Sequence, residues 1–175
     1  MVLSNIHDKY HDKYKRLSKS VRKEAASFQT KHQKAHAVHR ILHKTLFKKY
    51  HVYANSLKDV FDKGRYNCVS AAIIENAILE DMGIKTKAVR TPTHVYSLVY
   101  TEKGAIEIEN TAAEGFNPIR SKSRWRTMLK RQRRQMNKED RESIAAYIKA
   151  IDANKREIID NQTLAAALYS NTGVL

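Results

Sequence analysis

The feature that most constrains this chain is an apolar helix pattern that directly follows its single cysteine. Residues 69–82 are mostly apolar, and they lie between Asn67, a residue type that caps helix N-termini, and Gly83, a residue type that ends helices. Cys68 is therefore expected in the first turn of a buried helix. There the helix dipole and the unpaired backbone N–H groups favour a thiolate over a thiol. A lone cysteine is more often an inert core residue, so a nucleophile needs partners elsewhere in the chain.

Length and composition indicate one folded domain, with or without helical extensions. The chain has 175 residues, of which 42% are hydrophobic and 29% charged. Its single cysteine excludes an internal disulfide. No run approaches the roughly 18 apolar residues of a membrane span. The first residues lack the apolar core of a signal peptide, so we expect a cytoplasmic protein if the chain is complete, and an exported one if a signal segment has been removed.

The net charge of +15 is concentrated at both ends of the chain. Residues 1–50 carry 13 Lys/Arg against 3 Asp/Glu, residues 51–119 carry 7 against 9, and residues 120–175 carry 13 against 6. The basic flanks are suited to a nucleic acid, an anionic membrane surface or an acidic polymer. The run 120–135 has eight Lys/Arg, no acidic residue and Trp125, a composition that suits phosphate contact with base stacking. The alternatives for this run are a solvated helix and a basic edge packed on the acidic loop around Glu114.

The order of the predicted elements indicates an α+β fold with a buried helix packed on a small antiparallel sheet. Hydrophobic periodicity favours helices in the N-terminal part, after Cys68 and at the C-terminal end, and alternation favours strands between them. The predicted helices are 4–30, 31–50, the segment from Cys68 to Gly83, and about 137–169; the predicted strands are 84–90, 93–100 and 105–111; a single helical turn is expected near 57–61.

Four histidines form a stripe on the predicted helix 31–50. They are His32, His36, His39 and His43. Histidines one turn apart can bind zinc, but no Cys, Asp or Glu of the stripe completes a ligand set, and lysines and arginines surround it. We therefore predict no metal site, and expect a solvated or half-buried helix face.

A histidine and a carboxylate are predicted to meet across the hairpin that follows. His94 is the only histidine after Cys68. If residues 101–104 form the loop, Tyr100 pairs with Ala105, and His94 and Glu109 then share one face of the sheet on a diagonal. The apolar residues of both strands fall on the other face, with Asn110. A loop longer or shorter by one residue would bring Asn110 to His94 instead, so both residues remain candidates.

Three segments resemble the signature blocks of the transglutaminase-like superfamily. They are GRYNCVSAA (64–72), RTPTHVYSLV (90–99) and IEIENTAAEGF (106–116), and the resemblance covers about 35–115. It is closest to bacterial transglutaminase-like domains found beside tetratricopeptide repeats. It implies a papain-like α+β core and a cysteine acyl-transfer reaction, with no cofactor.

The resemblance also implies roles for individual residues. Cys68 would be the nucleophile and its backbone N–H an oxyanion donor, while His94 would be the general base and acid. The acidic position of the family falls on Glu109, where aspartate is commoner, and Asn110 is the alternative third member. Around this triad we expect Tyr66, Asn67 and Tyr96 to bind a protein or peptide substrate.

Three regions follow from these assignments. Residues 1–34 would be a basic helical extension, 35–118 the transglutaminase-like core, and 119–175 a basic loop with C-terminal helices. The tail NQTLAAALYSN resembles the opening helix of a tetratricopeptide repeat. The alternative to an enzyme is a fold of this kind that has lost catalysis and binds a polyanion or a protein through its basic flanks. The oligomeric state is not indicated by the sequence.

Overall fold

The computed structural model is a mixed α+β protein. It describes residues 8–117, 138, 141–142 and 156–171. The helices are α1 (Asp8–Ala25), α2 (Lys31–Thr45), α3 (Leu57–Lys63), α4 (Cys68–Asp81) and α7 (Asn161–Asn171), and the strands are β1 (Lys49–Tyr50), β2 (Arg65–Tyr66), β3 (Thr86–Arg90), β4 (Val95–Thr101), β5 (Gly104–Ile108) and β6 (Glu157–Ile159).

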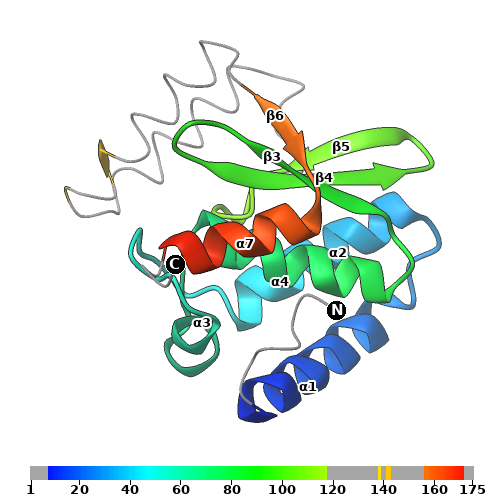
Figure 1. Ribbon diagram of the computed structural model, residues 1–175. Helices are drawn as coiled ribbons and strands as arrows, with labels where there is room; N and C mark the ends of the chain where they lie inside the picture. Colours follow the sequence, from blue (N-terminus) through cyan, green and yellow to red (C-terminus); the bar gives the residue numbers. More distant parts are fainter. Residues whose placement is uncertain (1–7, 118–137, 139–140, 143–155, 172–175) are drawn as a thin grey trace.

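A four-stranded sheet and helix α4 form the centre of the molecule. The strands follow the order β5-β4-β3-β6 with every neighbouring pair antiparallel, and β1 and β2 form a separate parallel pair. Helix α4 packs against β3 and β4, while α2 and α7 also contact it. Figure 1 shows the sheet on one side of α4 and helix α1 on the other. The predicted packing of the cysteine helix on a small antiparallel sheet is confirmed.

The boundaries of α4 agree with the prediction. The Asn67 side chain accepts a hydrogen bond from the N–H of Ser70, and the Ser70 side chain accepts one from the N–H of Asn67, which completes a capping box. Gly83 adopts a left-handed conformation with φ +71° just beyond the helix. Between these two signals nearly every residue is buried, as expected of a helix that is apolar on all sides.

The predicted hairpin register is also confirmed. Tyr100 pairs with Ala105, and Ser97 pairs with Ile108. Gly104 has φ +98°, so it supplies the conformation that closes the short turn. The register places the two ends of this hairpin, where His94 and Glu109 lie, beside each other.

Three helix predictions are wrong in part. The predicted helix 4–30 ends at Ala25, the last residue of α1. Residues 157–159 were expected to be helical but form β6, which pairs with β3 at the edge of the sheet. Pairing with the free backbone groups of β3 outweighs the local helical pattern, and Ile158 and Ile159 favour a strand. The predicted helix 31–50 ends at Thr45, because Tyr50 pairs with Tyr66 in the parallel strands. The expected helix over NQTLAAALYSN is confirmed as α7.

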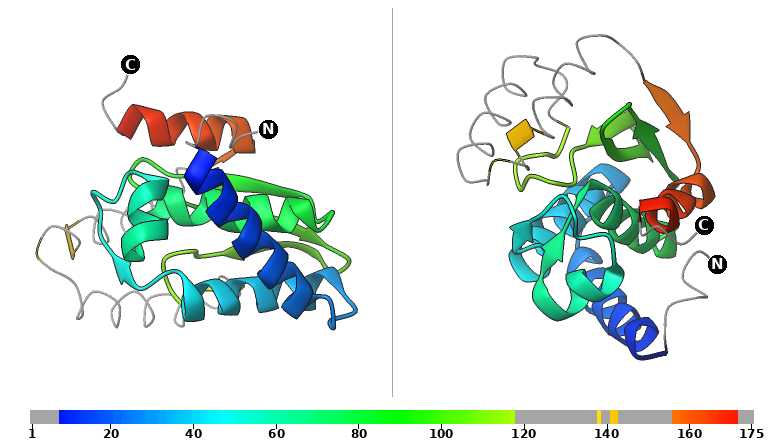
Figure 2. Two further views of the ribbon diagram at one scale, coloured as in Figure 1. Left: turned by 90° about the horizontal axis from the view of Figure 1, so that it is seen from below. Right: turned by 60° about the vertical axis from the view of Figure 1, so that its left-hand side comes forward.

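The flanking helices pack on the central part of the chain. Helix α1 contacts α2, α3 and α4, and the Tyr14 hydroxyl and the Ser18 hydroxyl both donate to Asp81, at 2.8 and 2.7 Å. Helix α7 packs on α4 and β3, with Leu164 fully buried. The two views of Figure 2 show α1 and α7 lying against the rest of the fold.

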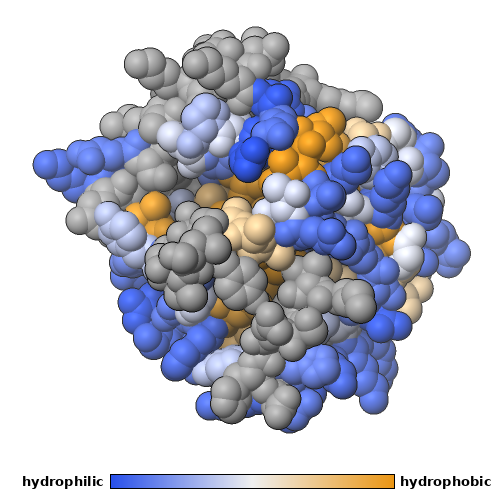
Figure 3. All heavy atoms as spheres, in the orientation of Figure 1, coloured by the Kyte–Doolittle hydropathy of each residue, from blue (hydrophilic) through white to orange (hydrophobic). Residues whose placement is uncertain are grey.

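Polar residues predominate in the described part of one face. Among the coloured residues of Figure 3 most are hydrophilic, with apolar atoms near the upper middle and the centre. Among the described residues, the large apolar side chains that are exposed are Phe28, Tyr53 and Ile158. No helix in the described part of the chain has the length and apolar character that a membrane span requires.

Candidate active site

Three elements that are distant in sequence bring Cys68, His94 and Glu109 together. Cys68 is the first residue of α4, His94 directly precedes β4, and Glu109 directly follows β5. The antiparallel pairing of β4 with β5 places the last two side by side, and the packing of α4 on β4 brings up the first. Each candidate therefore lies at the end of a regular element, where the rigid scaffold fixes its position.

The imidazole of His94 binds the carboxylate of Glu109. Its Nε2 lies 2.9 Å from Oε2 and 3.1 Å from Oε1 of Glu109. The two side chains are almost completely excluded from solvent, with exposed fractions of 4% and 0%. In a water-poor environment a charge-assisted pair of this kind is strong and well oriented.

The Cys68 side chain lies close enough to the His94 ring for its charge and hydrogen bonding to raise the pKa of that ring. Because Glu109 binds Nε2, Nδ1 is the ring nitrogen left for the sulfur. Cys68 is half-buried, unlike its two partners, so it is the member of the group that a molecule from solution can approach.

The charges around His94 stabilise its protonated form. Burial of the ring by itself lowers the pKa of His94, but the negative charges of Glu109 and Cys68, together with their hydrogen bonds, raise this pKa to about 10. Burial raises the pKa of Glu109, but the charge of His94 and the hydrogen bonds from His94 and Thr111 outweigh it, and the net direction is downward. At neutral pH an imidazolium therefore lies beside the sulfur, the arrangement that favours a thiolate nucleophile.

Hydrogen bonds within the loop that follows β5 also hold the Glu109 carboxylate in place. Its Oε1 accepts a hydrogen bond from the Thr111 hydroxyl at 2.6 Å and one from the Thr111 N–H at 3.1 Å. The Glu109 N–H donates to the carbonyl of Gly115 at 2.8 Å. Gly115 lies so close to this backbone that a Cβ there would clash with the Glu109 carbonyl oxygen. The carboxylate is thus held by its own loop as well as by His94.

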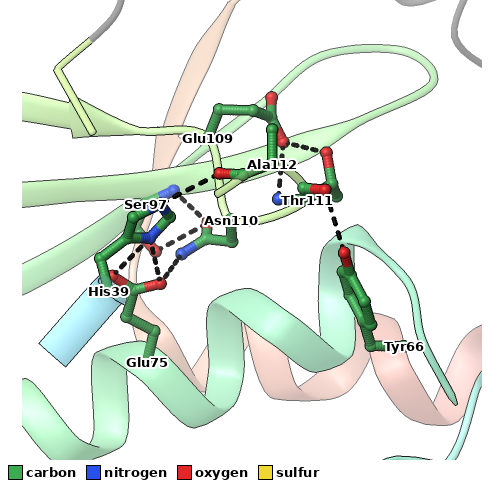
Figure 4. Close-up of polar contacts among 8 residues, drawn as sticks. All are labelled: His39, Tyr66, Glu75, Ser97, Glu109, Asn110, Thr111 and Ala112. Carbon is green, nitrogen blue, oxygen red and sulfur yellow. Dashed lines mark hydrogen bonds and ion pairs between the residues drawn. The ribbon is translucent and has the colours of Figure 1, made fainter. Parts of the chain in front are cut away.

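Asn110, the alternative third member, points elsewhere. Its side-chain oxygen accepts from the N–H of Ser97 at 2.9 Å and from the Ser97 hydroxyl at 3.0 Å, and its amide nitrogen donates to Glu75 at 2.8 Å. The structure therefore brings Glu109, and not Asn110, to the His94 ring. Figure 4 shows the two neighbouring side chains directed to different partners.

The three residues expected to bind substrate have internal partners. The Tyr66 hydroxyl donates to the Thr111 carbonyl at 3.1 Å, and Asn67 caps α4. Tyr96 is 1% exposed, and the guanidinium of Arg156 lies 5.6 Å from its ring centroid. These contacts make all three part of the framework around the triad, while a direct contact with substrate stays a prediction.

The histidine stripe lies against the loop that follows Glu109. The His32 and His36 rings contact the Phe116 ring, with centroids 5.2 and 4.5 Å apart. The expected solvated or half-buried face is wrong for His39, which is fully buried against Glu75. Among the described residues there is no group of three or more side chains suited to hold a metal ion.

Sequence reasoning missed the partnership of His39 and Glu75. One signal was available: Glu75 is the only charged residue of the segment 68–79, which is otherwise apolar apart from Ser70 and Asn76. A carboxylate in the middle of a buried helix needs a cationic or donor partner. The identity of that partner depends on helix packing, which the sequence pattern did not reveal.

The predicted basic segment 120–135 lies outside the described residues. Comparison with protein-family models, with curated proteins and with solved structures finds no match to this chain.

Proposed function

We propose that this protein is a transglutaminase-like cysteine enzyme that transfers or hydrolyses an acyl group of an amide or peptide substrate. The observation that carries the proposal is that the His94 ring binds the Glu109 carboxylate and is also influenced by the nearby Cys68 side chain. A nucleophile, a base and an orienting carboxylate in this order are the parts that cysteine acyl transfer needs. The resemblance of the three sequence blocks to the superfamily supports the same assignment, including a papain-like core.

The proposed reaction starts from a Cys68 thiolate beside the His94 imidazolium. The Cys68 thiolate attacks the carbonyl carbon of the amide, and the carbonyl oxygen becomes an oxyanion. The C–N bond then breaks, and the His94 imidazolium gives its proton to the departing amine, which leaves a thioester on Cys68. In the second half, neutral His94 takes a proton from water or from an acceptor amine, which attacks the thioester and releases the thiolate.

Two features of the scaffold support these steps. Glu109 keeps the ring oriented through Nε2 and stabilises the imidazolium. The N–H of Cys68 is the first amide of α4, a position without an intrahelical acceptor, so it can donate to the oxyanion.

The test is the rate at which Cys68 is alkylated by iodoacetamide at pH 6. We expect a rate well above that of a free thiol, because the proposed mechanism places a reactive sulfur beside the His94 imidazolium, and a large fall in His94→Ala. His11→Ala is the matched control, since His11 lies on α1, away from the site. A rate equal to that of a free thiol and unchanged in His94→Ala would reject the proposal. Amide substrates with and without an acceptor amine then separate transamidation from hydrolysis.

A second candidate function is polyanion binding by the N-terminal helices. A hollow of about 550 Å³ lies between α1, α2 and the end of α4, lined by Lys19, Arg22, Lys23 and Lys34 together with Ala26, Asp81 and Met82. None of these four cations forms an ion pair within the described part of the chain. The charge of Asp81 is shared with the hydroxyls of Tyr14 and Ser18. The hollow therefore carries an excess of positive charge toward solvent.

Polyanion binding is tested by fluorescence anisotropy with a labelled single-stranded oligonucleotide. If the hollow binds phosphates, affinity should fall steeply between about 50 and 200 mM salt and in Lys19→Glu/Lys23→Glu. Lys103→Glu/Lys49→Glu changes the net charge equally at exposed positions that do not line the hollow. Equal losses of affinity in both double variants would indicate nonspecific attraction. Absence of binding at the lowest salt would reject polyanion binding.

A further inference from the structure

We propose that a buried polar cluster of His39, Glu75, Ser97 and Asn110 positions the triad for catalysis. This positioning cluster touches none of the reacting atoms and acts through the elements that carry them. The inference rests on the proposed function, and it names residues that act at the same site. Figure 4 shows the cluster with the segment 109–112 beside it.

The cluster joins the same three elements that carry the triad. Glu75 lies two turns after Cys68 on α4, a spacing that returns to the same side of a helix. Ser97 lies three residues after His94 on β4, and Asn110 directly follows Glu109. A change in the relative position of any two triad members therefore also strains a bond of the cluster.

One side-chain amide makes the central connection. Asn110 accepts hydrogen bonds from the N–H and the hydroxyl of Ser97 at 2.9 and 3.0 Å, and it donates to Oε2 of Glu75 at 2.8 Å. Asn110 thus links β4 to α4 directly. Since Glu109 is the preceding residue, its backbone cannot shift without breaking these three bonds.

His39 extends the cluster to the far end of the Glu109 turn. Its Nδ1 lies 3.2 Å from both carboxylate oxygens of Glu75, and its Nε2 lies 3.0 Å from the carbonyl oxygen of Ala112. Both ring nitrogens face acceptors, which is the pattern of a protonated ring. Burial lowers the pKa of His39, but the charge of Glu75 and the hydrogen bonds outweigh it, and the net direction is upward.

The location of these groups favours a positioning role over a purely structural one. His39, Ser97, Glu75 and Asn110 are all completely buried, so none can contact a substrate. A buried ion pair adds little net stability compared with apolar packing, and its established use is to specify one arrangement. A catalytic group must be held within about 0.5 Å of its productive position, and the turn 109–112 lacks a regular element of its own to do so.

The experiment compares Glu75→Gln with Asn76→Ala. In Glu75→Gln the side-chain volume is kept, but the negative charge that pairs with His39 is lost and one of the two acceptor oxygens is replaced by an amide donor. Asn76 is the next residue of α4 and is also buried, but its amide donates to Lys87 and Asn161, outside the cluster. Each variant is assayed for unfolding by denaturant, for kcat and KM on the amide substrate that the wild type turns over, and for titration of the His94 ring by NMR.

The expected result separates positioning from stability. Glu75→Gln should lower kcat about tenfold or more with KM nearly unchanged, and the His94 titration should move to lower pH as Glu109 loses its alignment. Asn76→Ala should lose stability while keeping kcat and the His94 titration. If Glu75→Gln only loses stability, or if both variants behave alike, the proposal is overturned.

A milder variant keeps the proposal testable if Glu75→Gln does not fold. Ser97→Ala removes one hydroxyl and keeps the backbone bond to Asn110, and it should lower kcat about threefold with the same direction of change in the His94 titration. An unchanged titration in Ser97→Ala and Glu75→Gln would refute the positioning role even if the wild type turned over no substrate. Absence of turnover in the wild type, with a titration that does respond, would count against the proposed reaction alone.

Discussion

His94 Nε2 and Glu109 Oε2 lie 2.9 Å apart across two strand ends that the β4–β5 pairing brings together. The residues are 15 positions apart in sequence, and both side chains are withdrawn from solvent. The register of the hairpin therefore sets the distance between the imidazole and its carboxylate. Because Cys68 binds the same ring, this one register decides whether a triad can exist.

The first prediction concerns the titration of His94. Because Glu109 and Cys68 raise the pKa of His94 to about 10, the ring should stay protonated through neutral pH in an NMR titration. In Glu109→Gln the titration should move to lower pH, while Glu107→Gln, a change on the preceding strand β5, should leave it in place. A wild-type ring that titrates near 6.5 would contradict the assigned ion pair.

The same ion pair gives a pH dependence of stability. The folded-state pKa of His94 is above its ordinary value of 6.5, so its contribution to stability is complete below about pH 6.5 and is lost as pH rises toward 10. The difference in unfolding free energy between the wild type and Glu109→Gln should therefore be largest at pH 6.5. Denaturant melts at pH 6.5, 8 and 10 should show this difference shrinking, and a difference that grows with pH would refute the pairing.

The second prediction concerns Gly115. In Gly115→Ala the new Cβ would clash with the Glu109 carbonyl and lie 2.7 Å from the Ala112 carbonyl, so the turn must move. We expect a loss of about 3 kcal/mol in unfolding free energy and slower alkylation of Cys68. Gly104→Ala is the control, since a Cβ there meets no atom within 4 Å and only its φ of +98° causes strain. Its cost should be about 1 kcal/mol, with alkylation unchanged.

The third prediction separates the cap of α4 from caps in general. Asn67 accepts from the N–H of Ser70 at 2.9 Å, and Ser56 accepts from the N–H of Asp59 at 3.1 Å at the start of α3. Asn67→Ala and Ser56→Ala should each lower the unfolding free energy by about 1 kcal/mol. Only Asn67→Ala should also slow the reaction of Cys68 with iodoacetamide, and Asn67→Asp should restore it. Equal rates in both alanine variants would contradict the role assigned to this helix start.

The fourth prediction concerns acid destabilisation by His43. Burial and the charge of His39 lower the pKa of His43 to about 4, and its Nε2 has no hydrogen-bond partner among the described residues. A histidine whose folded-state pKa is lowered contributes stability above its ordinary pKa of 6.5, and this contribution is lost as pH falls toward 4. The loss should be about 3 kcal/mol over this interval.

His43→Asn tests this prediction directly. The amide keeps a hydrogen-bond donor near the Asn110 carbonyl, which acts on the His43 ring, but it does not titrate. Between pH 6.5 and 4 the unfolding free energy of His43→Asn should fall less than that of the wild type, as measured by denaturant melts. His11→Asn should keep the wild-type slope. A parallel slope in His43→Asn would mean that other groups control the acid response.

The helix and the hairpin could be predicted because their signals are local. Asn67 and Gly83 mark the ends of α4 through hydrogen bonds and a backbone conformation that involve only neighbouring residues. The register of β4 and β5 depends on one short turn, and from it the diagonal between His94 and Glu109 follows. The choice between Glu109 and Asn110 could not be made at that level, because it depended on the exact turn length.

Other features depended on contacts between distant segments. Residues 157–159 carry a helical pattern, yet they pair with β3, whose open edge is invisible in the local sequence. The histidine stripe predicts a solvated or half-buried position for His39, yet His39 lies on the side of α2 that faces Glu75. Both outcomes follow from which surfaces meet when the helices and the sheet pack.

The sequence by itself determined the Cys68 helix, the hairpin and the approach of His94 to the segment 109–110, since each arises from short-range geometry. Only the tertiary structure decided that Glu109 is the residue bound to the His94 ring, that Asn110 turns to Ser97 and Glu75, and that a second histidine lies buried behind the turn. The physical reason is burial: a polar side chain without water must bind whichever partner the packing brings to it.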